Sequence, residues 1–274
     1  MNCQSLVFFM TNIYAYPLCI QLNADVIYSV RFPKVLELLQ AKHFYGVELN
    51  LLNFDDAEFD KISSLLKNYD LILTSIASGA FADQYGLTLS DADDARRQNT
   101  VNMLKQKVIP FAERSHADII CGFIKGKAGD NLPNAKSQME KSLSELAHLC
   151  EYSGIHLYLE ATNHYEATLI NLVEEGAAFM CPGVRVLPDT YHMNIEEANM
   201  FKTMLVWREL YSNIHISDNN RYYPGFGSID FLKVIQTLRD MSYSGTLTIE
   251  GRNRYEIEAD IKESADYLAK VSAS

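Results

Sequence analysis

Four short apolar segments in the second half of the chain each end in a residue type that commonly binds metal ions. The segments are LYLE, VRVLPD, NIH and LTIE, and their last residues are Glu160, Asp189, His215 and Glu250. The intervals from 160 to 189, 189 to 215 and 215 to 250 are 29, 26 and 35 residues. One strand, one helix and their loops need about 30 residues, since eight such units make a barrel of roughly 250. The spacing therefore predicts one potential ligand per strand–helix unit.

Strand-like and helix-like patterns also alternate over the rest of the sequence, which is typical of a parallel sheet with crossover helices. GVELN (46–50) and DIICGFIKG (118–126) are predicted strands, with a long helix between Ala92 and Ser115. Eight strands are counted if LVFFM (6–10) is the first. We therefore predict an α/β fold, a (β/α)₈ TIM barrel that occupies residues 1–274 as one domain.

The segment between the first and second predicted strands is the irregular part of this pattern. Residues 14–30 show no clear periodicity, and DVIYSV within them could be mistaken for a strand. We place DVIYSV in a long first loop above the C-terminal face of the barrel.

The C-terminal ends of barrel strands converge on one open face, where active sites are built. Three carboxylates and one imidazole meeting there would repel one another unless a cation neutralised them. The sequence therefore predicts a divalent metal bound by Glu160, Asp189, His215 and Glu250. This ligand set favours Mn²⁺, with Mg²⁺, Co²⁺ or Zn²⁺ as alternatives.

Three further polar residues follow these strands and are candidates for binding a substrate. They are Glu166, His192 and Arg221. Other roles stay open at this point: Glu166 as a helix cap, His192 as a solvated loop residue, and Arg221 as a partner of Asp218.

Four basic residues follow the fourth and eighth predicted strands and could hold an anionic group of a substrate. They are Lys125, Lys127, Arg252 and Arg254. The alternative is that all four are solvated surface charges.

The composition narrows the partners and the compartment. The net charge is −11, which disfavours nucleic acid because phosphates are bound through Lys and Arg. Five scattered cysteines without a C-x-x-C pair indicate reduced thiols. We find no signal peptide pattern and no apolar stretch long enough to span a membrane. A cytoplasmic protein is expected, and whether it forms a homo-oligomer stays open.

Three long stretches resemble the ketose 3-epimerases of the xylose-isomerase-like barrel superfamily: LEATNHYEATLIN (159–171), DTYHMNIEE (189–197) and HISDNNRYYPGFGSIDF (215–231). Two more, SGAFADQYGLTLSDADDARRQ (78–98) and ICGFIKG (120–126), resemble the 5-keto-L-gluconate epimerase branch more than the tagatose and psicose branch. The resemblance implies a small sugar or sugar acid as substrate.

The resemblance also implies a role for each candidate residue. The metal ligands of that family correspond to Glu160, Asp189, His215 and Glu250, and the two glutamates would also act as the acid/base pair. Its substrate contacts fall on Glu166, His192 and Arg221. The implied reaction inverts C3 of a ketose or keto-sugar acid through an enediolate.

The chain departs from the family pattern at several positions. The family usually has Pro-x-Asn-Arg after the first ligand, where this chain has Ala161, Thr162, Asn163 and His164. Ser228 replaces a frequent histidine of the keto-acid branch. These changes leave the reaction type intact and affect the substrate.

Three other functions remain open from the sequence. An aldose–ketose isomerase of the hydroxypyruvate-isomerase type would use the same face. An apurinic-site endonuclease would need histidines on the third and fourth strands, where LILTSIAS and DIICGFIKG have none. A non-catalytic sugar-binding barrel could dispense with Glu160 or Glu250.

Overall fold

Eight parallel strands form the centre of the molecule in a computed structural model that describes residues 13–129 and 131–274. The strands are β1 Leu18–Leu22, β2 Gly46–Asn50, β3 Ile72–Ala77, β4 Asp118–Cys121, β5 Leu157–Glu160, β6 Val184–Leu187, β7 Asn213–Ile216 and β8 Thr246–Ile249. Their order in the sheet is β6-β5-β4-β3-β2-β1-β8-β7. The predicted (β/α)₈ TIM barrel is confirmed.

The gap between the two ends of this sheet is closed beside the candidate ligands. β6 and β7 are joined just beyond β6 by a parallel bridge between Asp189 and His215, and the His215 amide donates to the carbonyl of Pro188 at 2.9 Å. Closure of the barrel thus places two of the predicted ligands side by side.

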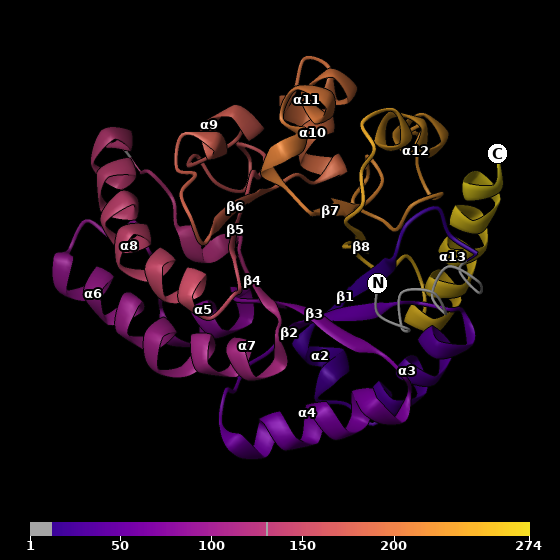
Figure 1. The fold of residues 1–274 in the computed structure, drawn as a ribbon, viewed down its shortest axis with the longest axis horizontal. Coiled ribbons are helices and arrows are strands. Elements are labelled where there is room, and N and C mark those ends of the chain that lie inside the picture. Colours follow the sequence, from indigo (N-terminus) through magenta and orange to yellow (C-terminus); the bar gives the residue numbers. More distant parts are fainter. Residues whose placement is uncertain (1–12, 130) are drawn as a thin grey trace.

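The helices ring the strands on the outside (Figure 1). They are α2 Ala24–Ile27, α3 Phe32–Ala41, α4 Asp56–Asn68, α5 Gly79–Tyr85, α6 Asp94–Met103, α7 Ile109–Ser115, α8 Leu132–Tyr152, α9 Val173–Ala177, α10 Thr190–Glu196, α11 Met200–Val206, α12 Phe231–Asp240 and α13 Ile257–Ala273. Short 3₁₀ turns lie at Phe123–Lys125 (η2) and Arg208–Leu210 (η3). Within the described residues, no helix is both long enough and apolar enough to span a bilayer.

The apolar faces of these helices pack against the strands. In α3, Val35, Leu36 and Leu39 have no exposed surface, as their helical spacing predicts. Each such side chain contributes about 1.5–3 kcal/mol through burial. The strands are themselves buried on both faces, and their sequences are therefore nearly continuous apolar runs.

The first strand differs from our prediction. LVFFM (6–10) lies outside the described residues, and β1 is LCIQL, inside the segment that we predicted to be irregular. Gln21 interrupts the apolar run of LCIQL, because its side chain points inward and donates to the buried carboxylate of Glu48. DVIYSV does lie in the connection after β1, partly as the short helix α2.

Two predicted elements are interrupted. The long helix between Ala92 and Ser115 contains a π-helical stretch, Leu104–Val108 (η1), that links α6 to α7. Pro110, the second residue of α7, lacks an N–H, which removes one helical hydrogen bond. The predicted strand 118–126 ends at Cys121, because the chain turns at Gly122 into η2.

Candidate active site

The four predicted ligands converge at the C-terminal ends of four consecutive strands. Glu160 is the last residue of β5, and His215 lies in β7. Asp189 lies two residues beyond the end of β6, and Glu250 is the first residue after β8. Each offers one ligand atom, and these atoms all lie within 4.8 Å of one another. Glu160 Oε1 is buried and makes no hydrogen bond, so a lone pair is free to bind a cation. The cluster could therefore hold a metal ion.

Asp189 has a second, structural role as the N-cap of α10. Its Oδ1 accepts a hydrogen bond from the Tyr191 amide at 2.7 Å, which satisfies one of the free donors at the helix N-terminus. Its Oδ2 lies 2.5 Å from Arg221 Nη1. Burial raises the pKa of Asp189, and the Arg221 charge opposes that rise.

Glu250 and Glu160 are held as carboxylates by neighbouring cations. Glu250 Oε1 lies 3.0 Å from Arg221 Nη2, and Oε2 lies 2.7 Å from His215 Nδ1. Burial raises the pKa of Glu250, but Arg221 and His215 outweigh it and lower that pKa to about 2. Burial likewise opposes ionisation of Glu160, and the imidazoles of His192 and His215, 3.5 and 3.6 Å from its Oε1, hold its pKa well below the usual range.

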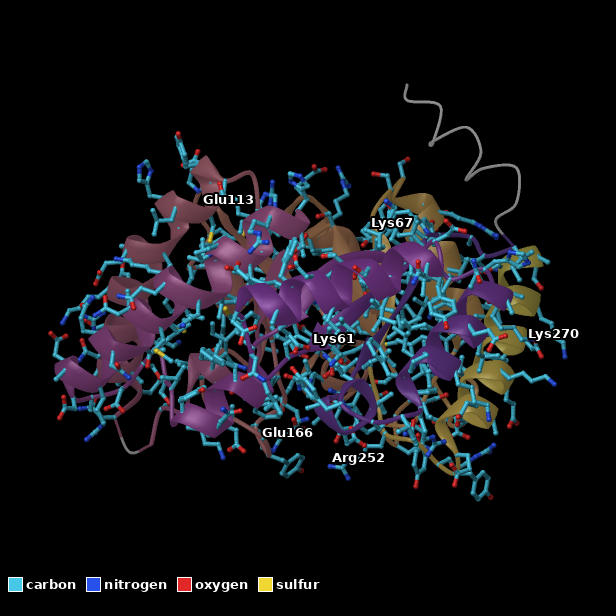
Figure 2. The ribbon with its side chains drawn as sticks, turned by 90° about the horizontal axis from the view of Figure 1, so that it is seen from below. Lys61, Lys67, Glu113, Glu166, Arg252 and Lys270 are labelled. Carbon is cyan, nitrogen blue, oxygen red and sulfur yellow. The ribbon has the colours of Figure 1, made fainter. Side chains whose placement is uncertain are left out.

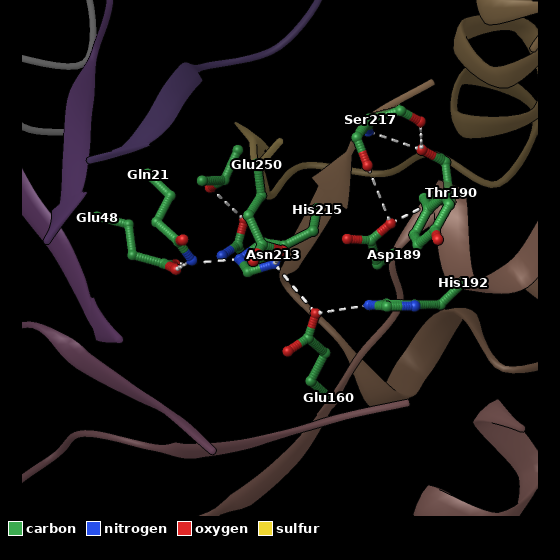
Figure 3. A network of polar contacts seen from close by, with 12 residues as sticks. Gln21, Glu48, Glu160, Asp189, Thr190, His192, Asn213, His215, Ser217 and Glu250 are labelled. Atoms are coloured by element: carbon green, nitrogen blue, oxygen red, sulfur yellow. Dashed lines mark hydrogen bonds and ion pairs between the residues drawn. The ribbon is translucent and has the colours of Figure 1, made fainter. Parts of the chain in front are cut away.

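The ring of His215 is oriented by a buried carboxylate that is not among the site residues predicted from the sequence (Figure 3). His215 Nε2 lies 3.1 Å from Glu48 Oε2, and Glu48 in turn accepts from Gln21 Nε2 at 2.6 Å and Ser75 Oγ at 2.7 Å. This arrangement directs Nδ1 of His215 toward Glu160 and Glu250. Carboxylates of this kind fix the tautomer of metal-binding histidines.

The sequence did contain a signal for Glu48. It is the one charged residue in the strand GVELN, and a charged side chain inside an otherwise apolar strand has to be paired. Its partner was not predictable, since His215 lies 167 residues further along the chain.

Two of the three predicted substrate residues lie against the cluster. His192 is buried, and its Nε2 lies 3.5 Å from Glu160 Oε1. Arg221 bridges Asp189 and Glu250, and its guanidinium lies 5.0 Å from the Tyr191 ring centroid. A solvated His192 is therefore wrong, and so is an Arg221–Asp218 side-chain pair.

Glu166 lies further out and is half-buried. Its Oε1 accepts from Asn163 Nδ2 at 3.1 Å, which connects it to His192 through the same asparagine. A capping role for Glu166 is wrong, because the next helix begins only at Val173.

Asp218 instead organises the loop between β7 and α12. Its carboxylate accepts from the backbone amides of Gly225, Gly227 and Ile229 at 2.8–3.0 Å. A Cβ at Gly227 would lie 2.4 Å from Asp218 Oδ1, so the close approach requires glycine. Arg221 lies in this same loop.

The four basic residues proposed to bind an anionic group have different environments. Arg254 is engaged by Glu263 at 2.7 Å and by the Phe226 ring at 3.9 Å. Lys127 and Arg252 are exposed, and Figure 2 shows Arg252 at the same edge of the molecule as Glu166. The backbone amide of Arg252 donates to the Arg221 carbonyl at 2.7 Å, which places its α-carbon beside the site.

Lys125 differs from the other three because it has no exposed surface. Its ammonium donates to Thr162 Oγ1 at 2.7 Å, two residues beyond Glu160. Burial lowers the pKa of Lys125 to about 8 from 10.5, and the negative charges of Glu160 and Glu166 limit that decrease. Lys125 is thus part of the wall of the site and is not a surface contact for substrate.

This burial predicts a pH-dependent stability difference between wild type and Lys125→Met. At neutral pH the lysine is charged in both the folded and the unfolded state, so folding carries the full desolvation cost, about 3 kcal/mol for a pKa lowered from 10.5 to about 8. Between pH 8 and 10.5 only the unfolded chain holds this proton, so wild-type stability rises with pH relative to the variant. Urea unfolding of both proteins from pH 7 to 10.5 measures this; a difference that does not change with pH would contradict it.

The fold and the cluster together define a class of protein: a TIM barrel with a potential metal site at the C-terminal ends of β5 to β8. The chain belongs to the xylose isomerase-like TIM barrel family, whose profile matches residues 36–271.

Two curated relatives and one solved structure show how the chain compares. The 3-dehydro-D-guloside 4-epimerase of Escherichia coli (strain K12) is 28% identical over 227 residues, 75% of this chain and 85% of that protein. The ketose 3-epimerase of Arthrobacter globiformis is 26% identical over 226 residues, 76% of each chain. The apo crystal structure of 3-keto-D-glucoside 4-epimerase from E. coli has a TM-score of 0.81 at 23% identity, covering 94% of this chain and 100% of that chain. This kinship supports an isomerase of the epimerase type.

Proposed function

We propose that this protein is a metal-dependent sugar epimerase that inverts C3 of a ketose or keto-sugar acid through an enediolate. Glu160 and Glu250 are the acid/base pair, and Glu166, His192 and Arg221 bind the substrate. The observation that carries the proposal is the convergence of two ionised glutamates from β5 and β8 on one cluster whose ligand atoms lie within 4.8 Å.

The chemistry requires a base on one side of the reacting carbon and an acid on the other. The hydrogen on C3 of a ketose is weakly acidic because it is adjacent to the C2 carbonyl. One glutamate removes this proton and the other returns a proton to the opposite face, and the two exchange roles in the reverse direction. Glu250, with a pKa of about 2, is ionised at neutral pH, as a base must be.

Glu160, Asp189, His215 and Glu250 would hold the cation. When bound, a divalent cation supplies Lewis-acid polarisation of the carbonyl and stabilises the charge that develops as the proton leaves. Mn²⁺ is the preferred ion for three carboxylates and one imidazole. His192, Glu166 and Arg221 hold the C1–C2 end of the substrate so that C3 lies between the two glutamates.

A second candidate reaction is epimerisation at C4 of a 3-keto sugar. It uses the same chemistry, because C4 is then the carbon adjacent to the carbonyl. The E. coli relative favours it, because that protein is a 3-dehydro-D-guloside 4-epimerase and the match spans 85% of its length.

Proton exchange in deuterated water tests the proposal. The protein with Mn²⁺ is incubated with fructose, tagatose, a 5-keto-hexonate and a 3-keto-glucoside, and NMR locates the deuterium in each product. The expected result is deuterium, with inverted configuration, at C3 of a 2-ketose, or at C4 of the 5-keto-hexonate, which is the equivalent carbon next to its C5 carbonyl. Label at C4 of the 3-keto-glucoside supports the second candidate, label at C1 or C2 indicates an aldose–ketose isomerase, and no label in any sugar contradicts an epimerase.

The same panel tests whether the substrate is anionic. Arg252 is the exposed basic side chain nearest in sequence to Glu250, and a charge-assisted contact with a carboxylate contributes about 1.5–3 kcal/mol. We expect a higher kcat/KM for the 5-keto-hexonate than for fructose or tagatose, and a smaller preference in Arg252→Gln. A clear preference of the wild type for the neutral sugars would refute the acid-binding role.

A further inference from the structure

Asn163 is a fully buried residue that touches both of the candidate substrate residues His192 and Glu166. Its backbone amide donates to His192 Nδ1 at 3.1 Å. Its side-chain Nδ2 lies 2.8 Å from the same ring nitrogen and 3.1 Å from Glu166 Oε1. Its Oδ1 accepts from the Tyr165 amide at 3.1 Å. Every polar atom of this side chain is therefore used.

The orientation of the Asn163 amide is determined from two sides. The backbone N–H of Tyr165 can only donate, so the atom facing it must be the carbonyl oxygen. The Glu166 carboxylate can only accept when ionised, so the atom facing it must be the NH₂ group. Turning the amide over would break both hydrogen bonds.

This orientation determines which nitrogen of His192 carries a proton. Both groups of Asn163 that face Nδ1 are N–H donors, so Nδ1 must offer a lone pair and Nε2 must carry the hydrogen. Burial lowers the pKa of His192, and the carboxylates of Asp189 and Glu160 outweigh it and raise that pKa. A proton on Nδ1 would nevertheless point at two N–H groups, which would first have to move away.

Glu166 is complementary to this ring. One carboxylate oxygen is occupied by Asn163 Nδ2, and within residues 13–129 and 131–274 no hydrogen bond forms to the other oxygen. His192 therefore offers a donor through Nε2, and Glu166 offers an acceptor. A sugar with adjacent carbonyl and hydroxyl groups has one acceptor and one donor to match them.

We propose that Asn163 is a positioning residue that sets His192 as an Nε2–H donor and Glu166 as an acceptor for two neighbouring oxygens of the substrate. The proposal rests on the assignment of His192 and Glu166 to substrate binding. It goes further by naming the residue that connects them and the tautomer that this residue enforces.

Nitrogen NMR of the imidazole tests the tautomer without an activity assay. Protein labelled with ¹⁵N-histidine is studied in the presence of diamagnetic Mg²⁺, and the His192 signals are assigned by their loss in His192→Asn. The expected wild-type spectrum is that of the Nε2–H tautomer. Asn163→Asp places an acceptor beside Nδ1, so the spectrum should shift toward a ring that carries a proton on Nδ1. A wild-type ring protonated on Nδ1 would overturn the proposal.

Kinetics test the positioning role. We expect kcat/KM to fall about 10- to 100-fold in both Asn163→Ala and Asn163→Asp, mainly through KM, because both oxygens of the substrate lose a positioned partner. Asn171→Ala is the matched control: Asn171 bonds the carbonyls of Thr162 and Ala167 in the same loop and touches neither His192 nor Glu166. Equal losses in Asn163→Ala and the control, or a normal KM in both Asn163 variants, would refute positioning.

An error in the proposed reaction and an error in the positioning role of Asn163 would give different results. If wild type exchanges no proton with any sugar, the proposed reaction is wrong, and the wild-type imidazole spectrum still decides the tautomer. If wild type is active and the Asn163→Asp ring keeps the wild-type spectrum, the side chain of Asn163 does not set the tautomer and the positioning proposal is wrong.

Discussion

Glu250→Gln is expected to retain the fold and lose epimerase activity by at least about 10²–10⁴-fold, the contribution of a general acid–base group. Glutamine has nearly the same shape and can still offer an oxygen to a cation or to Arg221. It cannot take up or release a proton at C3. The measurement is the rate of C3 deuterium incorporation under saturating Mn²⁺, with the metal content determined in parallel.

Glu256→Gln is the control for this substitution. Glu256 lies six residues further on, in an exposed ion pair with Arg31 at 2.7 Å, and exposed pairs contribute little to stability. It should behave like wild type. A metal-replete Glu250→Gln protein with near-normal turnover would remove Glu250 from the acid/base pair and leave it at most a ligand.

The fold was largely predictable because its strongest signals are local. Strands such as GVELN and LYLE are short apolar runs between amphipathic helices, and their alternation permits few folds other than a parallel barrel. The first strand was misplaced for a physical reason. LVFFM is more apolar than LCIQL, and only the pairing of Ile20 with Val47 and Ile249 shows that LCIQL is the strand.

The site residues at the ends of strands were predictable from the sequence. The residues whose roles depend on contacts across the barrel were not. The four cluster residues recur once per unit, so their convergence follows from the fold alone. Glu48 lies in β2 and Lys125 lies in the turn η2 after β4, so neither belongs to the repeating set of ligands. Their roles depend on contacts with His215 and Thr162. Such contacts have no local sequence pattern.

The structure also explains the polar segment that follows Glu160. His164 replaces the arginine of the resembling family, and its Nδ1 lies 2.5 Å from Glu196 Oε1, at the end of α10. Asn163, which matches the family pattern, faces inward to His192 and Glu166. The departure at His164 thus lies on the exposed side of the loop, whereas Asn163 faces inward.

Removal of the metal is expected to abolish activity, with a loss of about 10³-fold or more if the cation supplies several kcal/mol of transition-state stabilisation. We expect reloading to restore activity with one divalent cation per chain, Mn²⁺ more effectively than Mg²⁺, Co²⁺ or Zn²⁺. Metal analysis of chelator-treated and reloaded protein gives the stoichiometry. Thermal unfolding gives a second readout, because an ion that binds only the folded chain stabilises it by about 2.7 kcal/mol at one hundred times its Kd.

Asp189→Asn tests the role of Asp189 in metal binding without removing its role as a helix cap. Asparagine caps helices as well as aspartate does, so the hydrogen bond to the Tyr191 amide is expected to persist in the variant. The charge that would bind the cation is lost. Asp230→Asn is the matched control, since Asp230 caps α12 through the Lys233 amide at 3.0 Å and lies outside the cluster.

These variants distinguish three accounts of the cluster. A single catalytic cation predicts that Asp189→Asn loses metal, metal-dependent stabilisation and activity together, while Asp230→Asn loses none of them. A stoichiometry near three metal ions per chain would refute the single-metal site and support an apurinic-site endonuclease instead. If the wild-type protein takes up no cation and stays active after chelation, then Arg221 and His215 alone balance the carboxylates, and the catalytic role of a metal is wrong. The Arg221 contacts with Asp189 and Glu250 make this the sharpest alternative, because they show that a protein cation can reach the same carboxylates.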